Sequence, residues 1–263
     1  MRTAPRRIRG KLESGDKAYG IAVQLPSPEI VEAVGYAGYD FAWIDAEHGA
    51  FDLSDLRELI RAADAVGIDS LVRVAGHGPT AIQHALDLGA TGIIAPDVRD
   101  VRQARAIVSA GHFAPIGTRG ACPCGRAVGH LSQHWSSDYR RMDADVLIFG
   151  IIEHPVGVDN VESIAREGGL DGLMFGPFDL AMNLGLGDDD ISHPEIEEMH
   201  NRVTGATRAA GIEYVTPNAA WESDLDATGS RIIPVAGDRA ALVSTFMRLL
   251  AESSGRPMFE TAK

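Results

Sequence analysis

The chain has 263 residues, of which 45% are hydrophobic and 23% charged, with a formal net charge of −13 at pH 7. This composition is typical of a globular chain with a sizeable core and excludes general disorder. The negative charge argues against a nucleic-acid partner, because phosphate binding requires clustered Lys and Arg. The sequence contains no run of eighteen apolar residues, so we expect no contact with a membrane.

Eight short apolar runs bounded by turn residues predict eight strands. In chain order they are 20–25, 41–45, 70–74, 92–95, 146–152, 172–175, 212–216 and 231–235. Helical patterns separate them, among them 53–66, 80–88, 101–110 and 193–210. Continuous apolar runs are typical of parallel strands covered on both faces, and eight of them predict a closed (β/α)₈ TIM barrel. An open doubly wound sheet is disfavoured, because no Gly-rich turn follows the first strand.

We expect one domain over residues 1–263, with an N-terminal extension of about residues 1–16. The connection 116–145 is unusually long, and we expect it to be a substrate lid or a subunit contact with a short helix around 135–141. It carries Cys122 and Cys124, which we interpret as reduced thiols of a cytoplasmic protein.

Polar residues follow several predicted strands where a barrel builds its active site, at the carboxyl ends. Glu153 and Asp179 come directly after neighbouring strands. Two carboxylates in this setting predict a site for a hard divalent cation that completes its coordination with water and substrate oxygens. The alternative is that each carboxylate caps the helix that follows it.

The second and third strands end in Asp45 and Arg73, and His48 follows three residues after Asp45. His48 is a candidate general base that Asp45 could hold in one tautomer; the alternative is a structural histidine. Arg73 is a candidate partner for an anion or a developing oxyanion, or for a structural ion pair with Asp45 or Glu47. Gly176 would let backbone amides approach a substrate carboxylate.

Six motifs occur together in one order along residues 18–250: Trp43-Ile-Asp-Ala-Glu-His-Gly49, Leu71-Val-Arg-Val74, Leu86-Asp-Leu-Gly-Ala90, Gly117-Thr-Arg-Gly120, Ile152-Glu153 and Gly176-Pro-Phe-Asp-Leu180. In this combination the chain resembles the HpcH/HpaI family of metal-dependent class II pyruvate aldolases, whose fold is a TIM barrel of the phosphoenolpyruvate/pyruvate type. The resemblance implies an aldehyde-lyase that reversibly cleaves 4-hydroxy-2-oxoacids to pyruvate and an aldehyde, and that also decarboxylates oxaloacetate. A carbon–carbon lyase of the citrate-lyase or malyl-CoA-lyase kind, and a noncatalytic keto-acid-binding relative, are the alternatives.

The resemblance also implies roles for individual residues. Glu153 and Asp179 would hold Mg²⁺ or Mn²⁺, with Co²⁺ and other divalent metals as further options. His48 would be the acid/base, with Asp45 orienting it and Asp87 raising its basicity, and Arg73 would steady the charge at C2. The substrate would also contact Gly176, Phe178, Asp179, Arg73 and the residue at position 151.

Two positions depart from the family's pattern. Ile151 stands where the family has a substrate-binding Gln, and Phe178 stands where it favours Ala, so we expect a change in the substrate pocket. The resemblance further implies a hexamer, a trimer of dimers, in which the last helix, around 240–250, is exchanged between subunits.

Overall fold

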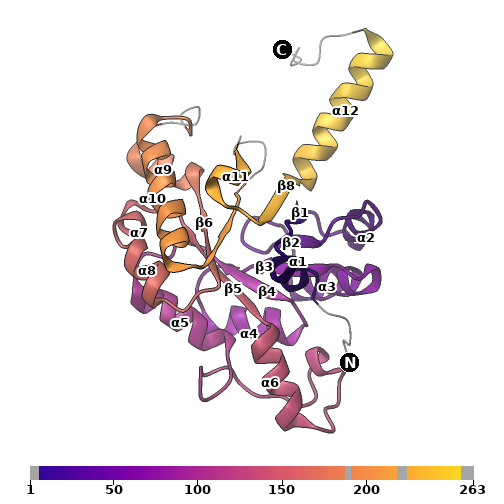
Figure 1. Cartoon of the computed structure of the whole chain (residues 1–263). Helices are drawn as coiled ribbons and strands as arrows, with labels where there is room; N and C mark the ends of the chain where they lie inside the picture. The colour runs from indigo at the N-terminus through magenta and orange to yellow at the C-terminus, as the bar shows by residue number, and fades with distance from the viewer. Residues whose placement is uncertain (1–5, 187–190, 218–223, 256–263) are drawn as a thin grey trace.

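A computed structural model describes residues 6–186, 191–217 and 224–255, and its centre is a closed barrel of eight parallel strands in sequence order (Figure 1). The strands are β1 Ala18–Val23, β2 Phe41–Asp45, β3 Asp69–Arg73, β4 Gly92–Ala95, β5 Leu147–Ile152, β6 Gly172–Phe175, β7 Glu213–Val215 and β8 Ile232–Gly237. All eight predicted strands and the predicted TIM barrel are therefore confirmed.

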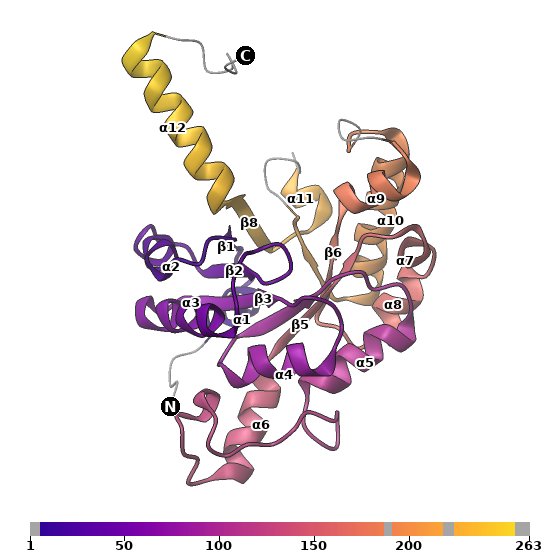
Figure 2. The ribbon, with the colours of Figure 1, turned by 180° about the vertical axis from the view of Figure 1, so that it is seen from behind.

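Helices surround the barrel and connect successive strands (Figures 1 and 2). They are α1 Arg7–Ser14, α2 Pro28–Tyr36, α3 Leu53–Val66, α4 Pro79–Asp87, α5 Val101–Gly111, the 3-10 turn η1 Arg126–Val128, α6 Trp135–Asp145, α7 Pro155–Asp159, α8 Val161–Glu167, α9 Pro177–Leu184, α10 Pro194–Ala210, α11 Leu225–Thr228 and α12 Asp238–Ser254. The four predicted helices are present to within one residue at each end. Asp52 begins α3 with a capping box that it shares with Asp55, which explains the position of that helix start.

Apolar side chains fill both sides of the strands, as expected for a parallel sheet covered on both faces. One buried cluster fills the barrel interior and includes Phe41, Trp43, Leu71, Phe149 and Ile151. A larger cluster lies between the strands and the surrounding helices. The barrel is therefore a packed core, and a ligand has room only beyond the strand ends.

Helix α1 closes the amino end of the barrel. Ile8 is fully buried, and its backbone N–H donates to Oδ2 of Asp69, the first residue of β3, at 2.8 Å. Most of the expected N-terminal extension is thus part of the packed fold, while residues 1–5 lie outside the described residues. Among the described residues, a cavity remains at the carboxyl end of the barrel.

The long connection 116–145 includes α6, as expected, and lies beside the amino end of β5, far from the strand carboxyl ends (Figure 1). No described residue of this connection lines the cavity at the carboxyl ends. It is therefore no lid over the cavity of its own chain.

Helix α12 projects away from the barrel in both ribbon views (Figures 1 and 2). Within the described part of the chain, Asp238 is the one buried residue of this helix. Four of its apolar side chains are between 47% and 63% exposed, namely Val243, Phe246, Leu249 and Leu250.

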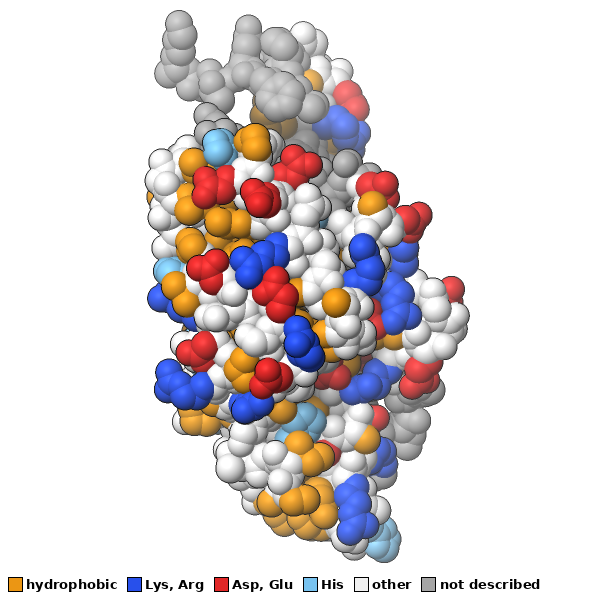
Figure 3. All heavy atoms as spheres, turned by 60° about the vertical axis from the view of Figure 1, so that its left-hand side comes forward, with side chains coloured by type: hydrophobic (Ala, Val, Ile, Leu, Met, Phe, Trp, Pro, Cys, Tyr) orange, Lys and Arg blue, Asp and Glu red, His pale blue; other side chains and the backbone are white. Residues whose placement is uncertain are grey.

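Within the described ranges, no helix has both the length and the apolar character needed to cross a membrane. Acidic and basic side chains are interspersed on the face shown in Figure 3.

Candidate active site

A cavity of about 620 Å³ opens at the carboxyl ends of the strands, where a TIM barrel carries its active site. It is lined by Trp43, His48, Arg73, Ile151, Glu153, Met174, Phe175, Gly176, Pro177, Phe178, Asp179, Ile191 and Pro217. Seven of the nine residues predicted for the site are in this set, and Asp45 hydrogen-bonds to one of its members. Only Asp87 lies elsewhere.

Glu153 follows β5 directly and is a buried residue, 8% exposed. Oε1 accepts the backbone N–H of Asp97 at 2.6 Å, and Asp97 has a positive φ of 50° in the turn after β4. Burial, followed by the negative charge of Asp179, raises the pKa of Glu153 to about 7. The side chain is thus held in one place in an environment that disfavours its negative charge.

Asp179 lies in the first turn of α9, and its side chain is exposed to the cavity mouth. The N-cap residue of this helix is Gly176, which has no side chain to bond the free amides of the first turn. A Cβ at Gly176 would lie 2.5 Å from Cβ of Glu153 and 2.9 Å from its Oε2. Any larger residue at position 176 would overlap Glu153, so α9 can begin this close to Glu153 only because the residue is glycine.

Asp45 and Arg73 are register partners at the ends of β2 and β3, and they form a two-pronged ion pair. Arg73 Nε donates to Asp45 Oδ1 at 2.7 Å, and Gln24 Nε2 donates to Asp45 Oδ2, also at 2.7 Å. Burial would raise the pKa of Asp45, but the hydrogen bond and positive charge of Arg73, together with the hydrogen bond from Gln24, outweigh burial and keep the pKa below its usual value. Arg73 also pairs with Glu47 at 3.3 Å. The structural ion pair considered for Arg73 is therefore present.

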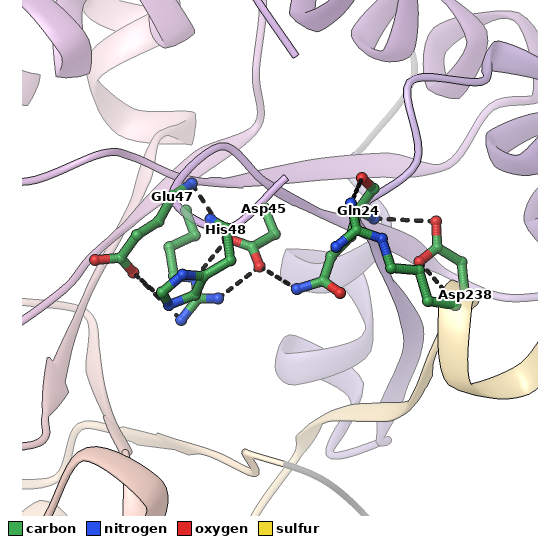
Figure 4. A network of polar contacts seen from close by, with 7 residues as sticks. Gln24, Asp45, Glu47, His48 and Asp238 are labelled. Carbon is green, nitrogen blue, oxygen red and sulfur yellow. Dashed lines mark hydrogen bonds and ion pairs between the residues drawn. The ribbon is translucent and has the colours of Figure 1, made fainter. Parts of the chain in front are cut away.

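His48 lies at the rim of the cavity with its side chain 60% exposed. Its Nε2 is 3.8 Å from Oε2 of Glu47, and its backbone N–H donates to Asp45 Oδ1 at 3.2 Å. Asp45 thus holds the backbone of His48, whereas the prediction had it orienting the imidazole. Figure 4 shows Glu47, His48, Asp45 and Gln24 in one row of polar contacts that reaches Asp238 at the start of α12.

Asp87 is the last residue of α4, and the chain then returns to the amino end of β4. Its Oδ1 accepts from Nη2 of Arg119 at 2.7 Å. In one chain, Asp87 therefore lies at the opposite end of the barrel from His48. Any contact between Asp87 and the imidazole would have to come from a second copy of the chain.

The two positions that depart from the family's pattern both face the cavity. Ile151 is 2% exposed and pairs in register with Met174, which is equally buried, whereas Phe178 is 62% exposed at the mouth. Sequence reasoning missed Met174 and Trp43, because side chains that face the barrel interior look like ordinary core residues in an apolar run. Gln24 was detectable, as a polar residue inside the first predicted strand.

Comparison with known proteins identifies relatives over most of the chain. The family model HpcH/HpaI aldolase/citrate lyase matches residues 19–244. A 2-dehydro-3,6-dideoxy-6-sulfogluconate aldolase of Pseudomonas putida is 33% identical over 241 residues, which cover 90% of this chain and 92% of the relative. A 4-hydroxy-2-oxovalerate aldolase of Novosphingobium aromaticivorans is 36% identical over 216 residues, covering 81% of each chain.

Among solved structures, an HpcH/HpaI aldolase/citrate lyase family protein of Burkholderia cenocepacia J2315 superposes with a TM-score of 0.87 at 31% identity. The match covers 95% of this chain and 99% of that one. Sequence and fold thus agree over nearly the whole length of the chain. The chain belongs to the HpcH/HpaI aldolase/citrate lyase family.

Proposed function

We propose that the chain is a metal-dependent aldolase, a carbon–carbon lyase that reversibly cleaves 4-hydroxy-2-oxoacids to pyruvate and an aldehyde. The observation that carries this proposal is the pair Glu153 and Asp179 in the cavity, where the charge of Asp179 helps raise the pKa of Glu153 to about 7. The aldolase names of the two sequence relatives support the reaction class. We further propose that the same site decarboxylates oxaloacetate, which yields pyruvate by the same type of bond cleavage.

The charges around the cavity fit a divalent cation. Asp45, Glu47, Glu153 and Asp179 supply four carboxylates, whereas Arg73 is the one Lys or Arg among the described residues that line the cavity, and it is engaged by Asp45 and Glu47. The charge of Arg73 lowers the pKa of Glu153, but burial and the charge of Asp179 outweigh it, so an added cation would be favoured here. Oxygen donors favour hard cations such as Mg²⁺ or Mn²⁺ over zinc or copper.

The protein supplies only part of the coordination sphere. Across the described ranges, no group of three or more His, Cys, Asp or Glu side chains is arranged to hold a metal ion. Two carboxylates that leave the other positions to water and substrate are the usual arrangement for Mg²⁺. When bound, the cation would act as a Lewis acid that polarises the oxygens of the 2-oxoacid and favours its enolate.

The remaining groups have separate tasks in this proposal. The free amides at the start of α9, at Phe178 and Asp179, bind the carboxylate of the 2-oxoacid, since a helix N-terminus attracts anions. Arg73, fixed by Asp45, presents positive charge to the oxygen at C2. His48 takes the proton from the C4 hydroxyl when the carbon–carbon bond breaks and returns it in the addition direction.

Metal removal tests the proposal against a noncatalytic, keto-acid-binding role. We expect the protein to release pyruvate from oxaloacetate with added Mg²⁺ or Mn²⁺, and to lose this activity in EDTA and regain it when metal is restored. A coupled lactate dehydrogenase assay measures the pyruvate, with the metal-catalysed reaction without protein subtracted. Tight metal binding without activity on oxaloacetate or any 4-hydroxy-2-oxoacid would contradict the enzymatic proposal.

A Gly176→Ala substitution is expected to weaken metal binding by at least about tenfold, because the added methyl group would overlap Glu153 and force its carboxylate to move. Gly205→Ala is the matched control, since a Cβ there meets nothing within 4 Å and the residue lies inside α10. That control should gain about 0.5–1 kcal/mol of stability and keep its metal affinity. Titration calorimetry with Mn²⁺ compares the two variants, and equal affinities would argue against Glu153 as a ligand.

We also propose a homo-oligomer, namely a hexamer built as a trimer of dimers with α12 exchanged between subunits. The apolar side chains of α12 that no described residue buries, Val243, Phe246, Leu249 and Leu250, support this, as does the position of Asp87 far from His48 in one chain. Sedimentation equilibrium should give the mass of six chains, and a monomer would exclude the proposal.

Cytoplasmic localisation remains part of the proposal. It is supported by Cys122 and Cys124, which are both exposed and unbonded to each other, since exposed thiols persist most readily in a reducing compartment.

A further inference from the structure

Gln24 lies between the active site and the start of α12 and contacts both (Figure 4). It follows β1 directly, where the chain leaves the barrel for α2. Its side chain donates to the Asp45 carboxylate, and its backbone N–H donates to the Asp238 carboxylate at 3.0 Å. Gln24 has no task in the proposed chemistry, although its amide reaches the ion pair that holds Arg73.

The Asp45 side chain is 2% exposed, so its two oxygens depend on donors from the protein. Oδ1 accepts from Arg73 Nε and from the backbone N–H groups of Glu47 and His48. Oδ2 accepts from Arg73 Nη2 and, at 2.7 Å, from Gln24 Nε2, and no other described residue donates to it. Loss of the Gln24 amide would therefore leave a buried carboxylate oxygen short of a donor.

The position of Arg73 depends on Asp45. Two of its nitrogens, Nε and Nη2, donate to Asp45, while Nη1 lies 3.3 Å from Oε2 of Glu47 and the guanidinium covers the ring of Trp43. Because a guanidinium is planar and rigid, a rotation of the Asp45 carboxylate carries the guanidinium with it. Gln24 is a neutral donor, so it fixes Asp45 without competing with Arg73 for the negative charge.

The backbone of Gln24 is held in turn by the first two residues of α12. Asp238 is 4% exposed, and its Oδ2 accepts the backbone N–H groups of Gln24 and Leu25 at 3.0 and 2.9 Å. Arg239 Nη2 donates to the backbone carbonyl of Gln24, also at 3.0 Å. The segment after β1 thus takes its position from the start of α12.

We infer that Gln24 is a positioning residue that aligns Arg73 through Asp45 and couples this alignment to the start of α12. The inference rests on the proposed aldolase function, in which Arg73 stabilises negative charge on the oxygen at C2. Gln24 is absent from the described lining of the cavity, so it acts through Asp45 and touches no substrate atom. In the proposed hexamer, the contacts of α12 with a second copy of the chain thereby reach the active site.

Gln24→Met tests the side-chain contact, because methionine keeps the length of the side chain and removes the amide donor. We expect kcat to fall by at least about tenfold for both oxaloacetate decarboxylation and aldol cleavage, since both form an enolate whose charge Arg73 stabilises. Mn²⁺ affinity should be unchanged, because Gln24 bonds to Asp45 and Asp238 and to neither proposed metal ligand. An unchanged kcat in both reactions, or a loss in aldol cleavage alone, would overturn the inference.

Thr91→Val is the matched control, since it removes a neutral donor to another buried aspartate, Asp69, with little change in shape. This pair lies at the amino end of the barrel, and neither residue lines the cavity. The control should lower the denaturant midpoint of unfolding and leave kcat unchanged. Equal losses of kcat in Thr91→Val and Gln24→Met would make the effect a general consequence of destabilisation and would contradict a positioning role.

Gln24→Glu adds a readout that a purely structural role would not change. When protonated, the introduced carboxyl group can donate to Asp45 as the amide does; when ionised, it faces the like charges of Asp45 and Asp238. Arg73 is already paired with Asp45, and Arg239 bonds to the backbone carbonyl. The ratio of kcat in this variant to kcat in the unmodified protein should therefore fall by at least about fivefold from about pH 5 to about pH 8. The ratio cancels the titration of groups that both proteins share, and a ratio independent of pH would contradict the inference.

Asp238→Asn, alone and combined with Gln24→Met, tests the link to α12. Asparagine keeps one acceptor oxygen and loses the other, which weakens the hold of α12 on the backbone of Gln24. Because both changes act through the bond from Gln24 to Asp45, the combined loss of kcat should be at least about threefold smaller than the product of the single losses. The comparison is made at a concentration at which the variants sediment as the unmodified protein does. Losses that multiply, or an Asp238→Asn variant with normal kcat, would overturn the link to α12.

The unmodified protein distinguishes a failure of this inference from a failure of the proposed function. If it catalyses both reactions and Gln24→Met does so equally well, only the role of Gln24 is wrong. If the unmodified protein with Mn²⁺ catalyses neither reaction, the aldolase function is wrong and the inference fails with it.

Discussion

Replacing Glu153 with glutamine is expected to weaken Mn²⁺ or Mg²⁺ binding by at least about 100-fold and to abolish lyase activity. Glutamine keeps the shape of the side chain and can still accept the N–H of Asp97, but it removes one of the two charged ligands that the cavity offers. Glu213→Gln, the same change at a glutamate paired with Arg231 at the amino end of β7, is the matched control and should keep its metal affinity. Undiminished affinity in Glu153→Gln would remove Glu153 from the metal site.

The same variant should change how the stability of the metal-free protein depends on pH. The pKa of Glu153 is raised from 4.5 to about 7 in the folded chain, first by burial and then by Asp179. The folded state therefore holds this proton more tightly than the unfolded state, so the Glu153 contribution to stability falls as pH rises from 4.5 to about 7. That contribution is at most about 3 kcal/mol.

Urea unfolding in EDTA at about pH 5 and about pH 8, on either side of this window, measures the effect. The loss of stability between the two pH values should be smaller in Glu153→Gln than in the unmodified protein. At the higher pH, the metal-free variant should be the more stable of the two, because it no longer buries a carboxylate. An identical pH dependence would show that Glu153 titrates normally.

Replacing His48 with alanine is expected to lower kcat for aldol cleavage by about 10²–10⁴-fold, the usual contribution of a positioned general base. Metal affinity and oxaloacetate decarboxylation should be largely retained, because His48 is no proposed metal ligand and decarboxylation has no hydroxyl proton to remove. The variant should fold normally, because His48 lies at the rim of the cavity with 60% of its side chain exposed.

His84→Ala removes an exposed histidine from α4, outside the cavity, and should leave both reactions unchanged. Parallel assays of a 4-hydroxy-2-oxoacid and of oxaloacetate separate the two activities. If both fell together in His48→Ala, then His48 would act in substrate binding or in enolate formation, and the proposed transfer of the hydroxyl proton would be wrong.

The barrel was predictable because its determinants are local. Each strand is a short apolar run between turn residues, and the eight runs alternate with helical patterns, so pattern alone was sufficient to place them. The positions of Glu153 and Asp179 followed in the same way, since parallel strands bring residues at their carboxyl ends to the same end of a barrel. The motif order, in turn, was sufficient to identify the family.

The partners of the charged residues were decided only by the tertiary structure. Asp45 is three residues from His48 in the sequence, yet it pairs with Arg73 because β2 and β3 align the two in register. Asp87, placed beside His48 by resemblance, lies at the other end of the barrel. The sequence by itself thus determined the barrel, the family and most of the polar residues that line the cavity. Side-chain pairing depends on strand register and on distances across the barrel, which an apolar pattern along the chain does not encode.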